Sequence, residues 1–306
     1  MRTRVLQPPE TPMTTIYDAI ETAAGELFVR ALKDIPSDVR GALKHALANE
    51  QSGGFQTAEQ VLFTILENID TADTEDTLVC QDTGLPVFKV VVGLPIDIAE
   101  LKLRLQKGCE RATADCPLRS NTVHPLTRKH TGTNTGMGIP VIKLEFDPSL
   151  GRIEMVMAPK GSGSENMSFL KMLTPAEGSK GVKKFVLQCI FESGAKPCPP
   201  MIVGIGLGGT SDLAMQLAKD ASTFRKIGSA NADPDVAAIE RELLDKINQT
   251  GIGPQGLGGA TTALAVHIEW AHTHISQNPV AVNIQCWRGE RAEAAISADG
   301  AITYAL

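Results

Sequence analysis

Three cysteines in polar surroundings rich in glycine or proline are the residues of this sequence best suited to metal chemistry. Cys80, Cys198 and Cys286 lie in the segments VCQDTG, AKPCPP and NIQCWR. Thiolates bind iron and zinc, but the chain has neither a CxxC zinc pair nor a ferredoxin-type cysteine run, so spacing alone indicates no shared site. Cys109 and Cys189 fall within helical patterns, where a free cysteine is usually a small buried hydrophobic residue.

Polar side chains near two of these segments can move protons or bind anions. Asp82 follows the first cysteine closely and can hydrogen-bond a substrate hydroxyl or shuttle a proton. The alternative is an Asx-turn before Gly84. His272 and His274 form an HxH pair, which is compatible with a metal site but more often reflects a polar segment near a site.

Two glycine-rich stretches follow predicted strands. In residues 160–164, KGSGS, small side chains let backbone N–H groups approach an anion closely, so this stretch can cradle a carboxylate. It is not a P-loop, because the GxxxxGK[ST] pattern is absent. Residues 206–211 resemble a dinucleotide-binding loop, but the GxGxxG pattern fails at Ser211. We therefore predict tight packing of a strand against a helix there.

The elements that position these residues begin with a helical segment. Apolar residues recur at helical spacing over 15–32. Residues 38–51 and 58–71 are predicted as two further helices, the second opened by Thr57 with Gln60 at capping-box spacing.

Strands and helices alternate in the rest of the chain. The β-branched run 87–92 is predicted as a strand, and 141–146 and 153–157 are predicted to pair as a hairpin. Further strands are expected over 201–207 and 279–285. This order predicts an α/β (mixed α+β) fold, with a helical N-terminal part followed by a mixed sheet flanked by helices.

No repeat or clear linker divides the chain, so we predict a single domain over residues 1–306. Within it, residues 1–14 are expected to be flexible, residues 15–75 mainly helical, and residues 76–306 a mixture of strands and helices.

Composition excludes several classes of protein. The chain has 42% hydrophobic residues and a net charge of −6, which gives no general attraction to nucleic acid or an anionic membrane. No apolar run is long enough for a membrane span, and the first residues lack the apolar core of a secretory signal. Six cysteines in 306 residues, Cys116 among those without an assigned role, are too sparse for a disulfide scaffold. We therefore expect a cytoplasmic protein.

Five ordered motifs give the sequence a specific resemblance. CQDTG, KGSGSEN, CPP followed by GIGLGGTSD, GIGPQGLGG, and AHTH followed by a further cysteine together resemble the N-terminal region of class I fumarases. In two-subunit members this region is the separate α subunit of fumarate hydratase or L(+)-tartrate dehydratase. The resemblance extends from about residue 16 to the end of the chain.

This resemblance implies that Cys80, Cys198 and Cys286 are the three ligands of a [4Fe–4S] cluster with one open iron. Such an iron can act as a Lewis acid toward the departing hydroxide of a small dicarboxylic acid. A cluster that only transfers electrons normally has four cysteine ligands. An open iron also implies sensitivity to oxygen.

The resemblance further assigns residues to the substrate. Gln81, Asp82 and Thr83 match family residues at the substrate, and Asp82 would have the catalytic role. Arg119 matches an arginine that clamps a carboxylate in two parallel hydrogen bonds, whereas a lone loop arginine is more often a solvated surface residue.

Gly161 lies in the stretch that can cradle the second carboxylate. His274 matches a histidine that reaches the substrate, the alternative being a structural role. One-chain members of the family continue into a second domain with further basic side chains and the proposed catalytic base. We therefore expect either a separate β subunit that completes the site, with an α dimer inside an α2β2 assembly, or a fragment of a longer chain, and the closing segment favours the β subunit.

The expected reaction is the reversible hydration of fumarate to L-malate. The alternative within the same chemistry is dehydration of tartrate or a substituted malate, because one residue contact can reverse such a preference. Two other classes remain open: an iron–sulfur electron carrier or redox sensor, and a subunit that only scaffolds its partner.

Overall fold

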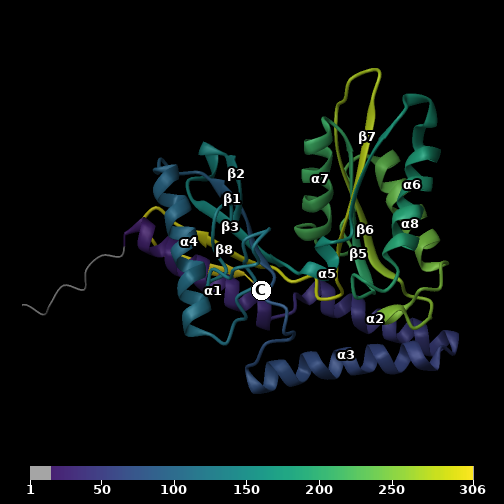
Figure 1. Cartoon of the computed structure of the whole chain (residues 1–306), viewed down its shortest axis with the longest axis horizontal. Coiled ribbons are helices and arrows are strands. Elements are labelled where there is room, and N and C mark those ends of the chain that lie inside the picture. The colour runs from purple at the N-terminus through teal and green to yellow at the C-terminus, as the bar shows by residue number, and fades with distance from the viewer. Residues whose placement is uncertain (1–14, 306) are drawn as a thin grey trace, which may run out of the picture.

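Two β-sheets, each with its own covering helices, organise the chain into two lobes that lie side by side (Figure 1). The computed structural model describes residues 15–305, so the predicted flexibility of residues 1–14 lies outside the described residues. The combination of helices and mixed sheets confirms the predicted mixed α/β fold class. Within the described range, no helix is long and apolar enough to cross a membrane.

The first lobe contains a five-stranded sheet of order β2-β1-β3-β8-β9, covered by two helices. Its elements are α1 (Ile16–Lys33), β1 (Leu85–Val92), α4 (Ile98–Asp115), β2 (Val141–Phe146), β3 (Ile153–Lys160), β8 (Ala292–Ile296) and β9 (Ile302–Ala305). Thr15 and Asp18 close a capping box at the start of α1, which satisfies backbone N–H groups that the helix leaves free. The apolar faces of α1 and α4 then share one core with the strands.

The second lobe contains a four-stranded sheet of order β4-β7-β5-β6. Its elements are β4 (Ser168–Leu173), α6 (Gly178–Ser193), β5 (Met201–Gly208), α7 (Ser211–Thr223), α8 (Pro234–Asn248), β6 (Ala263–Ala271) and β7 (Asn278–Gln285). In Figure 1, α7 lies on one face of the sheet, and α6 and α8 lie on the other. The two central strands, β5 and β7, are buried on both faces and read as nearly continuous apolar runs.

Two helices run beneath the lobes in the view of Figure 1, α2 (Ser37–Gly53) and α3 (Gln56–Glu75). They pack against each other through an apolar core. The predicted capping box at Thr57 is wrong, because α3 already begins at Gln56 and its N-cap residue makes no side-chain bond. Gly54 ends α2 with φ of 74°, and this tight turn starts α3 too early for Thr57 to be its cap.

The predicted hairpin between β2 and β3 is also wrong. Strand β1 lies between them, parallel to β2 and antiparallel to β3. The physical reason is burial: β1 is mostly buried, whereas β2 is half-exposed and takes the edge of the sheet. Strands β4 and β9 lie where the sequence had predicted none.

Glycines in β5 allow α7 to lie directly on the sheet. A Cβ atom at Gly206 would lie 1.9 Å from the carbonyl oxygen of Ala214, and one at Gly204 would lie 2.1 Å from that of Ala218. No side chain fits in that space. The prediction of tight strand-to-helix packing at this motif is therefore confirmed.

Gly206→Ala is expected to lower the free energy of unfolding by about 3 kcal/mol or more, because the added methyl must push β5 and α7 apart. Urea denaturation measures this change. The control is Gly41→Ala in α2, where an added Cβ meets no atom within 4 Å. Alanine there should stabilise the helix by up to about 1 kcal/mol. Equal effects at the two positions would contradict the packing argument.

Candidate functional site around three cysteine loops

Three loops that are distant in sequence meet between the lobes. Cys80 lies between α3 and β1, Cys198 lies between α6 and β5, and Cys286 directly follows β7. The backbone N–H of Trp287 donates to the carbonyl oxygen of Cys198 at 3.2 Å. Arg288 Nη2 donates to the carbonyl oxygen of Asp82 at 3.1 Å. The fold thus brings together the three segments that spacing alone could not connect.

Burial and neighbouring charges raise the pKa of two of these thiols, those of Cys198 and Cys286. Burial raises the pKa of Cys198, and the nearby Cys80 raises it further. Burial also raises the pKa of Cys286 to about 12, with Glu290 adding to the effect. Such thiols stay protonated near neutral pH until a metal or a cation compensates the thiolate charge.

The other buried cysteines behave as predicted. Cys109 and Cys189 are fully packed in the cores of the two lobes, on α4 and α6. Burial raises the pKa of both thiols. They are small hydrophobic residues, and neither lies in the three cysteine loops.

Two unsatisfied buried donors flank Cys286. Among the described residues, Arg288 Nη1 and Gln285 Nε2 are buried without a hydrogen-bond partner. Unpaired buried donors cost free energy, and sulfur atoms of an iron–sulfur cluster accept such hydrogen bonds. No three His, Cys, Asp or Glu side chains in the described part converge on a single metal ion. In a four-iron cluster each cysteine binds a different iron atom, so the three thiols do not have to converge on one point. The three cysteines therefore fit a cluster better than a single metal ion.

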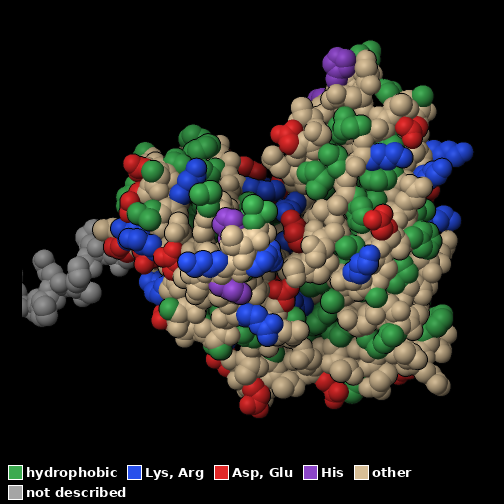
Figure 2. Space-filling model, viewed as in Figure 1, with side chains coloured by type: hydrophobic (Ala, Val, Ile, Leu, Met, Phe, Trp, Pro, Cys, Tyr) green, Lys and Arg blue, Asp and Glu red, His purple; other side chains and the backbone are tan. Residues whose placement is uncertain are grey.

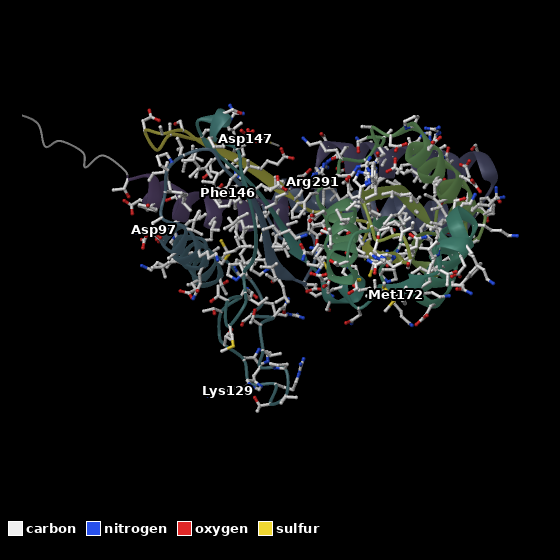
Figure 3. All side chains as sticks on the ribbon, turned by 90° about the horizontal axis from the view of Figure 1, so that it is seen from above. Asp97, Lys129, Phe146, Asp147, Met172 and Arg291 are labelled. Carbon is white, nitrogen blue, oxygen red and sulfur yellow. The ribbon has the colours of Figure 1, made fainter. Side chains whose placement is uncertain are left out.

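A cavity of about 650 Å³ opens beside these loops. Its lining includes Gln81, Asp82, Arg119, Asn121, Lys160 and Glu165. Figure 2 shows Lys and Arg side chains gathered in the hollow between the lobes. One wall is the base of a projecting segment, residues 119–139, which carries Lys129 near its tip (Figure 3). The chain as a whole is acidic, whereas this lining has three cations, Arg128 included, against two carboxylates, and this local excess of positive charge suits an anionic ligand.

Asp82 forms part of the cavity wall. Its Oδ1 accepts hydrogen bonds from the backbone N–H of Gly84 at 3.0 Å and from Asn121 Nδ2 at 2.9 Å. Its Oδ2 accepts one from the backbone N–H of Ser162 at 3.0 Å. The Asx-turn considered from the sequence is therefore present. The same carboxylate also lines the cavity, so the turn holds it in place for a ligand.

The other residues expected at the substrate take different positions. Thr83 is only 2% exposed, and its Oγ1 accepts a hydrogen bond from the backbone N–H of Arg119 at 2.9 Å, so it supports the wall from behind. Gln81 and Arg119 are exposed and line the cavity. Gly161 lies against Asp82, since a Cβ there would be 3.0 Å from Asp82 Oδ2.

Lys160 is a residue that the sequence analysis treated only as the start of a glycine-rich stretch. Its ammonium group is 3% exposed and donates to Ser164 Oγ at 2.9 Å, to Gln285 Oε1 at 3.0 Å and to the carbonyl oxygen of Ile284. Burial lowers its pKa to about 8. Lys160 therefore ties the cavity wall to the strand end that carries Cys286. The sequence feature that could have identified Lys160 is a lysine at the end of an apolar strand.

His274 does not lie with the other predicted site residues. It follows β6 in the turn before β7, whereas Cys286 follows the other end of β7. The eight residues of β7 span roughly 26 Å at the usual rise of a strand. His274 is exposed, and its Nδ1 accepts a hydrogen bond from the backbone N–H of Ser276 at 3.2 Å.

Comparison with known proteins gives a consistent family. The model of the family described as fumarate hydratase (Fumerase) matches residues 21–295. A Methanocaldococcus jannaschii protein, provisionally named L(+)-tartrate dehydratase subunit alpha, is 47% identical over 278 residues, which cover 90% of this chain and 96% of that protein. The L(+)-tartrate dehydratase subunit alpha of Escherichia coli K12 is 35% identical over 267 residues, covering 87% of this chain and 86% of its own length. This chain therefore belongs to the fumarate hydratase family of hydro-lyases.

Proposed function

We propose that this chain is the α subunit of a two-subunit, [4Fe–4S]-dependent hydro-lyase that reversibly hydrates fumarate to L-malate. The observation that carries this proposal is the meeting of the Cys80, Cys198 and Cys286 loops beside a cavity lined by Asp82 and Arg119. The family description supports fumarate. The names of both relatives support the second candidate, dehydration of L(+)-tartrate.

Cys80, Cys198 and Cys286 would hold the cluster. When bound there, it would supply Lewis acidity with one open iron, which makes hydroxide a better leaving group. The buried cations Arg288 and Lys160 lie close enough to Cys286 to offset the charge of its thiolate.

The chain's own polar groups would bind and orient the dicarboxylate. Arg119 is free to turn its guanidinium into the cavity and hold one carboxylate through two parallel hydrogen bonds. Gln81 would donate from the same wall, with Thr83 fixing the loop from behind. The glycine-rich stretch that contains Gly161 would bind the second carboxylate through backbone N–H groups other than that of Ser162, which already donates to Asp82.

Asp82 is the proposed catalytic residue of this subunit. An ionised carboxylate has about four acceptor positions, and Asp82 uses three of them within the protein. The remaining position would be left for a ligand in the cavity and could take or return the proton of a substrate hydroxyl. The three fixed hydrogen bonds prevent the carboxylate from turning away.

The site would need other chains to be complete. The relatives are named as α subunits, which supports a β subunit as the partner that adds basic side chains and the catalytic base. His274 lies at the far end of β7 from Cys286, so it can touch the substrate only if another copy of this chain supplies it. An α dimer within an α2β2 assembly would allow this.

The test is turnover by anaerobically purified complex, with fumarate, L(+)-tartrate and mesaconate as separate substrates. We expect one of the first two to react far faster than the others, and the α chain alone to be nearly inactive. Robust turnover without a partner would refute the subunit assignment. A complex that turns over none of the three would refute the reaction. Full activity of Cys80→Ser in the complex would favour a scaffold.

A further inference from the structure

Arg288 is a buried charge for which the proposed reaction gives no role. It lies in the loop between β7 and β8, and the residue is only 3% exposed. Its Nη2 donates to Glu290 Oε1 at 2.7 Å, and Glu290 is fully buried. A buried ion pair rarely adds stability over apolar residues of the same size, because desolvating both charges is costly. Its presence therefore calls for another explanation.

The guanidinium of Arg288 lies between the cysteine loops. Its Nη2 also donates to the carbonyl oxygen of Asp82, which ties it to the loop of Cys80. Burial lowers the pKa of Arg288, but the charges of Glu290, Cys286 and Cys80 together raise it above the ordinary value. One side chain thus contacts the Cys80 loop and lies near the sulfur atoms of both Cys80 and Cys286.

One face of this guanidinium is unsatisfied. Nη1 is buried and has no hydrogen-bond partner among the described residues. Glu290 also accepts a hydrogen bond from Cys286 Sγ at 3.7 Å, so the acid is shared between the arginine and the thiol. Nη1 is thus a buried donor two residues from Cys286, and a sulfur atom of a cluster held there could accept its hydrogen bond.

We propose that Arg288 is a positioning residue of the cluster site: Nη2 fixes the Cys80 loop against the Cys286 loop, and Nη1 donates to sulfur. This inference rests on the proposed function, because it needs the three cysteines to hold a cluster. Arginine suits the task because its planar guanidinium can donate to two different acceptors at once, whereas the ammonium group of lysine is a single point charge. Partners behind metal ligands of this kind are typically worth about 10- to 100-fold in metal affinity.

The experiment compares Arg288→Met with Arg291→Met in the anaerobically purified complex. Arg291 is the matched control because it lies in the same loop, is 7% exposed and pairs with Asp38 at 2.6 Å. Its Nη1 donates to the carbonyl oxygen of Gly289, within its own loop, and does not tie that loop to the loop of Cys80. Iron and sulfide content over time gives the cluster lifetime, and a redox titration gives its reduction potential. Amide hydrogen exchange of residues 80–84 in cluster-free protein reports whether the hydrogen bond from Arg288 to the Asp82 carbonyl oxygen holds this loop in place.

For Arg288→Met we expect about tenfold or faster cluster loss, a more negative reduction potential because a positive charge and a sulfur hydrogen bond are gone, and faster exchange over residues 80–84. Arg288→Lys should recover part of the potential but not the slow exchange. Arg291→Met should match the wild type in all three measurements.

Arg288→Met leaves the buried Glu290 unpaired, so the double variant Arg288→Met, Glu290→Gln provides a folded version without that charge. If the double variant keeps the wild-type lifetime, potential and exchange, the inference is wrong while the proposed function stands. If the wild-type complex holds no cluster, the proposed function fails and the inference fails with it.

Discussion

Cys198→Ser is expected to leave the chain without a stable iron–sulfur cluster and to reduce kcat of the complex by about 1000-fold or more. A Lewis acid contributes several kcal/mol to such a reaction, and each 1.36 kcal/mol corresponds to about a factor of ten. Cys198 is exposed and has φ of 54°, outside any helix or strand, so serine there creates no core cavity. Iron and sulfide content, measured together with turnover, gives the result.

Cys116→Ser is the matched control, because Cys116 is also partly exposed but caps α4, in the first lobe. Its iron content and kcat should equal those of the wild type. A Cys198→Ser complex that keeps both values would show that the cysteine is no ligand. Equal losses in both variants would point to general damage from losing a thiol.

Asp82→Asn should lower kcat by about 100- to 10,000-fold, the usual range for losing a general acid or base, while the cluster content stays at the wild-type level. The two effects separate because Arg288 holds the Asp82 loop through a backbone carbonyl, which the substitution does not change. The oxygen of the introduced amide can still accept hydrogen bonds. Its NH2 group, however, would face a donor that now pairs with a carboxylate oxygen, and it cannot take a proton. Steady-state kinetics and iron content are measured on the same sample.

The control for this variant is Asp97→Asn. Asp97 caps α4 by accepting from two backbone N–H groups, asparagine caps helices equally well, and Figure 3 shows it on the outer side of the first lobe. Its kcat should not change. An Asp82→Asn complex with full turnover would remove Asp82 from the chemistry, and one that has also lost its iron would make Asp82 a residue of the cluster site instead.

Local pattern was sufficient where the cause is local. The apolar periodicity over residues 15–32 and the β-branched run over residues 87–92 give the expected helix α1 and strand β1. The failure of the dinucleotide pattern at Ser211 correctly favoured close packing, since Gly206 directly faces α7. Such features depend on residues within a few positions of each other.

Features that depend on distant segments were not predictable. β2 and β3 each read as strands, but only the whole sheet decides that β1 lies between them. The sequence assigned no role to Arg288, because its burial depends on the distant Asp82 loop, whose carbonyl oxygen it contacts. His274 lies in the expected motif but at the opposite end of β7 from Cys286, because twelve residues that include a strand separate the two side chains by the length of that strand.

The most direct test of the account is Mössbauer spectroscopy of the 57Fe-labelled complex, prepared without oxygen, with and without substrate. The account predicts about four irons per α chain, of which one has a spectrum distinct from the other three and changes when the dicarboxylate is added. An active complex that contains no iron, or a cluster whose irons are all alike and indifferent to substrate, would contradict it.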